Sequence, residues 1–196
     1  MIDHTVNFLT EYLNTELQLF FGLDEDKVVM GNLVDPNGES SNEVLNKVVV
    51  SLVSMEHVTN ANYAKGGKKT LSIGGIAQNN DPVLLNLYIM VSANFESKQY
   101  HEALKMLSTV IGIFQTTNVF LRAAFPNIHP SMEKLSLEIV NLPLQEQIGV
   151  WNSLGAKYVP SILYKARVVT IDLQRIDNIL PEIKGLASKN VKKNEE

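Results

Sequence analysis

Four histidines are the side chains of this sequence best suited to hold a metal ion: His4, His57, His101 and His129. A protein metal site needs converging ligands, such as two histidines at helical spacing or a close pair with a third ligand downstream. His101 precedes Glu102, as in half of a zinc-binding helix, but Lys105 stands where the second histidine would fall. The sequence also lacks cysteine, which removes thiolate ligands and cysteine nucleophiles. We therefore expect no metal site.

The segment Ala64–Thr70 (AKGGKKT) places glycines before lysines, as phosphate-binding loops do. Walker A spacing counted back from Lys68 requires glycine at position 62 and Ser or Thr at position 69, where Asn62 and Lys69 stand. This mismatch favours a flexible loop tip. A small nucleotide-binding enzyme that uses the Gly66–Lys69 loop is kept as an alternative function.

Serine and carboxylate chemistry have weak support in the sequence. The segment Leu71–Gly75 comes closest to the Gly-x-Ser-x-Gly turn of serine hydrolases, but it lacks the first glycine. Glu133, Glu138 and Glu146 could supply paired carboxylates, yet the local pattern places each on a solvated face. The sequence therefore predicts a protein that is not an enzyme and has no cofactor.

The composition argues against two classes of partner. The formal net charge is −4 and no long basic run is present, whereas nucleic-acid binding requires clustered Lys and Arg. The longest mainly apolar run, Val83–Ala93, is about half the length of a membrane-spanning helix. We expect neither nucleic acid nor membrane as a partner. Hydrophobic residues make up 45% of the chain and charged residues 19%, a balance that leaves apolar surface for a protein interface.

The first half of the chain contains one helix followed by strands. Apolar residues recur every three or four positions over Ile2–Phe21, which predicts an amphipathic helix ended by Gly22. Two Val-rich segments, Lys27–Val34 and Asn46–Val58, predict strands joined by a polar loop too long for a tight hairpin. Val83–Ala93 is apolar on both alternating faces and predicts a central strand.

The second half contains two helices and two strands. Ser97–Thr116 predicts the main helix, with these residues facing the core: Tyr100, Ala103, Leu104, Leu107, Val110, Ile111 and Phe114. Lys134–Val140 alternates as a half-buried strand. Pro143 and Gly155 bound a short helix, with these residues facing the core: Leu144, Ile148, Trp151 and Leu154. Ile162–Leu173 alternates as the last strand.

These elements predict an α+β fold: a mixed, mainly antiparallel sheet of about four to six strands with an N-terminal helix, one long helix packed on the sheet and a short C-terminal helix. Residues 1–180 are expected to form a single domain with a flexible loop at about 60–81. Residues 181–196 are rich in Lys, Asn and Glu and predict a frayed, polar tail.

Four residues are candidates for a protein interface. Lys165 and Arg167 share one face of the last predicted strand, and Trp151 and Tyr158 lie just before it. Aromatic residues and arginine anchor protein interfaces more often than other types do. Two alternatives stay open: Trp151 belongs to the core, and the two cations keep an exposed edge strand soluble.

A set of segments in fixed order carries a family resemblance: Pro82–Phe95 (PVLLNLYIMVSANF), Tyr100–Leu104 (YHEAL), Ile113–Gln115 (IFQ), Leu135–Glu138 (LSLE), Trp151–Gly155 (WNSLG) and Tyr158–Ser161 (YVPS). Together they resemble the N-terminal domain of the cap, or tube-terminator, proteins of phage-tail-like contractile injection systems, including antifeeding-prophage and Photorhabdus virulence cassette particles. The resemblance covers most of Ile2–Asp172, and the order of the segments is more specific than any one of them.

The resemblance implies a phage tail-terminator-like fold and a structural role. Such a protein forms a ring of its own copies, a hexamer, that binds the inner tube and sheath and ends polymerisation distal to the baseplate. It is located in the bacterial cytoplasm during assembly and afterwards in the particle, including a particle released from the cell. Several relatives continue into a further C-terminal region, so an effector-loading adaptor on the same particle is a second alternative.

Overall fold

The computed structural model describes residues 2–35, 37–39, 42–58, 68–71, 75–78, 84–170 and 178–181. The chain divides into two compact units, which we describe separately. The main unit comprises residues 1–59 and 83–171, and the second comprises residues 60–82 and 172–196.

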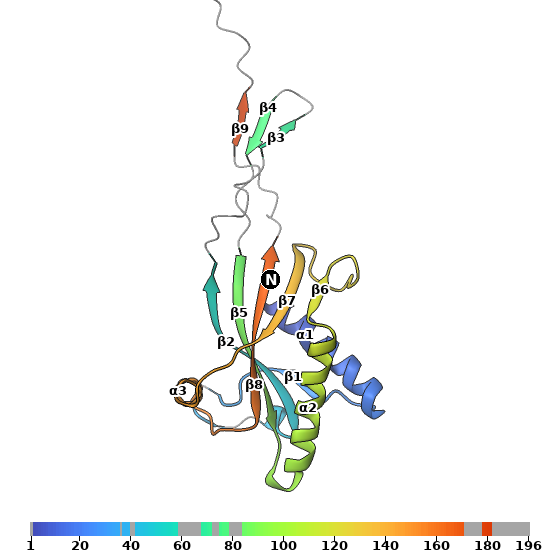
Figure 1. The fold of residues 1–196 in the computed structure, drawn as a ribbon, viewed down its shortest axis with the longest axis vertical. Helices are drawn as coiled ribbons and strands as arrows, with labels where there is room; N and C mark the ends of the chain where they lie inside the picture. The colour runs from blue at the N-terminus through green and yellow to red at the C-terminus, as the bar shows by residue number, and fades with distance from the viewer. Residues whose placement is uncertain are drawn as a thin grey trace, which may run out of the picture. The chain divides into compact units, whose positions relative to one another are not determined.

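The main unit is built on a six-stranded sheet with the strand order β1-β2-β5-β8-β7-β6 (Figure 1). In that order the strands are Val28–Met30, Lys47–His57, Leu84–Asn94, Ser161–Thr170, Met132–Ile139 and Val119–Leu121. Every neighbouring pair is antiparallel except β1–β2, which is parallel. The predicted fold class, an α+β protein with a mixed and mainly antiparallel sheet, is confirmed.

The central strand is β5, as the sequence predicts. It pairs with β2 on one side and with β8 on the other. Successive side chains of a strand point to opposite faces of the sheet, and Met90 and Val91 are both buried, in two different hydrophobic clusters. The continuous apolar run of β5 therefore reflects burial on both faces.

The edge strand β1 is closed by a side chain of the N-terminal helix. Asn14 donates from Nδ2 to the Val28 carbonyl oxygen at 2.9 Å and accepts from the Val28 amide at 2.8 Å. This pair satisfies backbone groups that an open sheet edge would expose.

Two helices cover one face of the sheet: α1 (Ile2–Phe21) and α2 (Tyr100–Thr116), the latter preceded by a 3₁₀ turn over Ser97–Gln99. The boundaries of α1 match the prediction, and Gly22 ends it at a φ of 66°, a conformation that glycine adopts without strain. The main helix and its position on the sheet are also as predicted.

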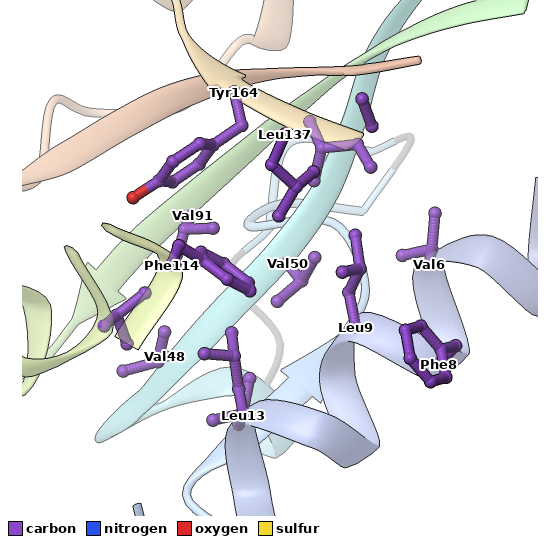
Figure 2. Close-up of a cluster of buried hydrophobic side chains, with 14 of the residues drawn as sticks. Val6, Phe8, Leu9, Leu13, Val48, Val50, Val91, Phe114, Leu137 and Tyr164 are labelled. Carbon is purple, nitrogen blue, oxygen red and sulfur yellow. The ribbon is translucent and has the colours of Figure 1, made fainter. Parts of the chain in front are cut away.

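The larger hydrophobic cluster lies between these helices and the sheet. Figure 2 shows Leu9 and Leu13 of α1 extending toward Val48 and Val50 of β2. The strand residue Tyr164 contributes an aromatic ring that meets Phe114 of α2 edge-on, with ring centroids 5.1 Å apart. Each of these residues is almost fully buried, so this cluster is the main source of hydrophobic stabilisation.

Two residues of α2 do not face this core as predicted. Tyr100 is exposed, and Leu104 is 40% exposed. The contact line of α2 runs through residues at helical spacing that include Met106, which the prediction omitted: Ala103, Met106, Leu107, Val110 and Phe114. The helix is therefore rotated about its axis relative to the predicted orientation.

The short helix α3 (Leu144–Leu154) lies on the opposite face of the sheet from α1 and α2 (Figure 1). It ends at Gly155 as predicted, with a φ of 65°. A smaller cluster holds it there: Leu33, Val44, Val49, Met90, Trp151 and Leu163.

Two residues of α3 that were predicted to face the core do not. Leu144 is 73% exposed and Ile148 is 51% exposed. The helix contacts the sheet through Trp151, with Val150 and Leu154 packed beside it. Ile148 lies off this line, and Leu144 belongs to the uncovered first turn, so both predictions were wrong.

The second unit contains a three-stranded antiparallel sheet in the order β3-β4-β9. Its strands are Lys68–Leu71, Gly75–Gln78 and Asn178–Pro181. Lys68 and Lys69 of the phosphate-loop candidate therefore belong to a strand, whereas a Walker A lysine opens a helix. Residues 59–67, 72–74, 79–83 and 182–196 lie outside the described residues, so the single domain, the flexible loop at 60–81 and the frayed tail stay predictions.

Candidate interaction surfaces

The four predicted interface residues fall into two places. Lys165 and Arg167 lie on β8, on the sheet face opposite α1 and α2, and both point away from the main core. Trp151 is buried under α3, and Tyr158 is 64% exposed beside it. Whether these four side chains contact a partner stays a prediction.

A network of polar side chains covers the part of this face beside Lys165. We call it the polar sheet face; its residues are Glu56, Asn86, Tyr88, Glu138, Lys165 and Arg167. Register explains their proximity, because Asn86 lies opposite both Glu56 and Arg167, and Lys165 lies opposite both Tyr88 and Glu138. The network thus crosses four strands of the sheet.

Glu56 is the centre of one half of this network. Asn86 Nδ2 and the Tyr88 hydroxyl each donate to its Oε2 at 3.1 Å, and the Lys165 Nζ lies 3.9 Å away. The hydrogen bonds from Asn86 and Tyr88, with a smaller contribution from the Lys165 charge, hold the pKa of Glu56 below its ordinary value. Lys165 also lies 5.7 Å from the centre of the Tyr88 ring.

The other half is a single ion pair. Arg167 Nη2 donates to Glu138 Oε2 at 2.9 Å, and both side chains are about half exposed. Such a pair contributes little to stability. The edge-strand explanation for the two cations is wrong, because β8 is an interior strand between β5 and β7.

Trp151 belongs to the core, as one of its two interpretations held. It is 4% exposed, and its ring meets that of Tyr158 edge-on with centroids 5.4 Å apart. The exposed Tyr158 ring thus lies on a buried support. Of the aromatic pair, only Tyr158 presents area that a partner could cover.

A groove between α1 and α2 is a surface that sequence reasoning missed. We call it the α1/α2 groove; it has a volume of about 910 Å³. Tyr12, Glu16 and Phe20 line it from α1, and Leu104 and Gly112 are among the residues that line it from α2. Phe20 and its neighbour Leu19 are both strongly exposed. The signal in the sequence was apolar residues of both helices that fall off the core-facing line.

The exposed side of α3 forms a second apolar surface. Leu144 and Ile148 are one helical turn apart, so together they form a ridge, which we call the α3 ridge. Gly149 follows on the exposed side of the same helix. The prediction found the apolar character of these residues but assigned them to the core.

The groups considered for chemistry are dispersed. His4 and His129 stack with centroids 4.5 Å apart, and His129 Nδ1 lies 2.6 Å from the Ser131 hydroxyl. His101 lines the α1/α2 groove instead. In the part of the chain that the structure describes, no three His, Cys, Asp or Glu residues are placed to share a metal ion. Nor does any described helix have the length and apolar character needed to span a membrane.

The fold is similar to two solved structures, each a terminator or cap. One is the sheath/tube terminator of an extracellular contractile injection system, PVC, in its extended state, with a TM-score of 0.59 and 12% identity over 97% of this chain and 63% of that chain. The other is the tube-terminating cap of the anti-feeding prophage, with a TM-score of 0.61 and 14% identity over 96% of this chain and 61% of that chain. The chain thus spans somewhat less than two thirds of each.

At these identities the likeness establishes the terminator-like fold. A comparison with curated protein sequences finds no significant match. The model of one family, the Pvc16 N-terminal domain, matches residues 4–183, which is nearly the whole chain. The ordered segments, the six-stranded sheet and this match lead to one assignment: the chain belongs to the Pvc16 N-terminal domain family.

Proposed function

We propose that the chain is a sheath/tube terminator, or cap, of a contractile injection system. The observation that carries the proposal is the terminator-like fold over nearly the whole chain, together with its family. In this role it forms a ring, a hexamer, on the inner tube and sheath at the end distal to the baseplate. It assembles in the bacterial cytoplasm and stays with the finished particle.

Elementary assembly rules support this role. Subunits or rings joined head to tail form a filament that grows without limit unless its end is closed. A terminator needs a surface that matches the growing end and another that does not. This task requires interfaces and no reacting groups, in keeping with the dispersed histidines and the self-paired polar sheet face.

The test is a polymerisation assay with purified inner-tube protein of the same particle. Tube lengths are measured by electron microscopy with and without an excess of the chain. We expect shorter tubes that carry extra density at one end. A chain heated until it no longer refolds is the control. Unchanged tube lengths and bare ends, both with and without sheath protein, would contradict the proposal.

A further inference from the structure

The main unit has two uncovered apolar surfaces on opposite faces of one sheet. The α1/α2 groove lies on the face that carries α1 and α2, and the α3 ridge lies on the other, as Figure 1 shows for the three helices. One surface is concave and the other is a convex helix side. Leu144 and Ile148 supply the apolar groups of the ridge, and Leu104 and Phe20 supply those of the groove. Their shapes and chemistry are complementary.

Each surface also contains a glycine that the subunit itself does not explain. Gly112 lies in the middle of α2 and lines the groove, and Gly149 lies in the middle of α3 beside Ile148. A Cβ added at either position would meet no atom within 4 Å. Glycine is disfavoured against alanine inside a helix. Close approach of another backbone accounts for both glycines.

The charges of the two surfaces are consistent with contact. Glu146 is the one charged residue of α3 and is exposed. The α2 wall of the groove carries Lys105 and His101, while Glu16 lies on the α1 wall. Lys105 lies 4.9 Å above the Phe21 ring, and no described carboxylate pairs with it. A ridge seated with Glu146 toward the α2 wall would give Lys105 an ionic partner.

We propose that the α3 ridge of one copy of this chain inserts into the α1/α2 groove of the next copy. The occupant of the groove is therefore a second copy of the chain. Because the two surfaces differ and lie on opposite faces, the contact is head to tail and repeats from copy to copy, as a ring requires. The inference rests on the proposed function, whose ring it equips with an interface.

Cysteine cross-linking tests the contact directly, since the chain has no cysteine of its own. Two single variants, Ile148→Cys and Leu104→Cys, are purified, mixed and oxidised, with and without inner-tube protein. We expect disulfide-linked dimers in the mixture and little dimer from either variant alone. Met55→Cys, which changes an exposed residue of β2, replaces Leu104→Cys in the control mixture and should give no dimer.

The other outcomes separate this inference from the proposed function. Dimers of Ile148→Cys alone would indicate a symmetric contact, and disulfides between Leu104→Cys and a cysteine-scanned tube protein would place the tube in the groove. Either result overturns the inference. A chain that caps tubes without the mixed cross-link overturns the inference and leaves the terminator function standing. A chain that neither caps tubes nor cross-links contradicts both.

Discussion

At the scale of single residues, Tyr164 is the buried group with the clearest physical consequence. It is 3% exposed, packs edge-on against Phe114, and its hydroxyl has no hydrogen-bond partner among the described residues. Burial raises the pKa of Tyr164 to about 12. The hydroxyl thus stays neutral in the folded chain at a pH where the unfolded chain ionises.

This yields a prediction for Tyr164→Phe. Removal of an unpaired buried hydroxyl should leave the free energy of unfolding at pH 7 unchanged or raise it by up to about 1 kcal/mol. The wild-type tyrosine binds its proton more tightly when folded, so its contribution to stability is complete below pH 10, the ordinary tyrosine pKa, and is lost as the pH rises toward 12. We therefore expect the variant to lose less stability between pH 9 and about 11.5.

Urea unfolding followed by circular dichroism at several pH values measures this difference. Tyr158→Phe is the matched control, because its ring is exposed and should not alter the pH dependence. If both variants followed the wild-type profile, the Tyr164 hydroxyl would not be buried as the structure shows.

At the scale of elements, the two outer helices are rotated so that part of their apolar surface is uncovered. Each sits on its sheet face by one line of side chains, with Val110 and Phe114 on the line of α2 and Trp151 on that of α3. Leu104 and Ile148 lie off these lines. The helices therefore serve two tasks, to cover the sheet and to present a surface.

Gly149→Ala should separate these two tasks. A mid-helix glycine costs about 0.5–1 kcal/mol relative to alanine, and the added methyl group meets nothing within the subunit. We expect the melting temperature of the dilute, dissociated chain to rise by about 2–4 °C. If the ridge inserts into a neighbouring copy, the same methyl group should weaken assembly, which light scattering over a concentration series measures.

Gly22→Ala is the control with the opposite sign. Gly22 has a φ of 66°, where a side chain is strained, so the substitution should lower the melting temperature and leave assembly of the folded chain unchanged. A Gly149→Ala chain that is more stable and assembles at the wild-type concentration would contradict the contact.

At the scale of the whole molecule, two surfaces compete for the role of ring interface. The polar sheet face contains the predicted residues Lys165 and Arg167, but each is paired within the chain, with Glu56 and Glu138 respectively. The α1/α2 groove and the α3 ridge have no such internal partners among the described residues. Desolvation of paired charges gives little net affinity, whereas burial of apolar area does.

Two substitutions decide between these surfaces. Ile148→Asp places a charge on the ridge and should raise the concentration needed for assembly more than tenfold, because a buried unpaired charge costs several kcal/mol. Arg167→Ala removes a half-exposed ion pair and should change assembly by less than about twofold. Both sites are exposed, so the free energy of unfolding should stay within about 0.5 kcal/mol of wild type.

Sedimentation velocity on both variants, alone and with inner-tube protein, provides the measurement. Loss of assembly in Arg167→Ala together with normal assembly in Ile148→Asp would reverse the assignment and identify the polar sheet face as the interface.

The local elements were predictable because their signals are local. The three- and four-residue spacing of α1, the Gly22 and Gly155 ends of α1 and α3, and the two-sided apolar run of β5 each follow from neighbouring residues and their φ preferences. The family resemblance is carried by the same segments, read in order. The sequence alone thus determined the α+β class, the main helices and most strands of the main sheet.

Tertiary structure decided what depends on distant partners. Only strand pairing shows that β1 runs parallel to β2, that β8 is interior, and that β9 joins β3 and β4 in the second unit across about half the chain. The rotation of α2 and α3 was equally hidden, because periodicity shows that a helix has an apolar side wider than one contact line but not which part of it the sheet covers. Leu104, Leu144 and Ile148 were therefore assigned to the core by their sequence and to the surface by packing.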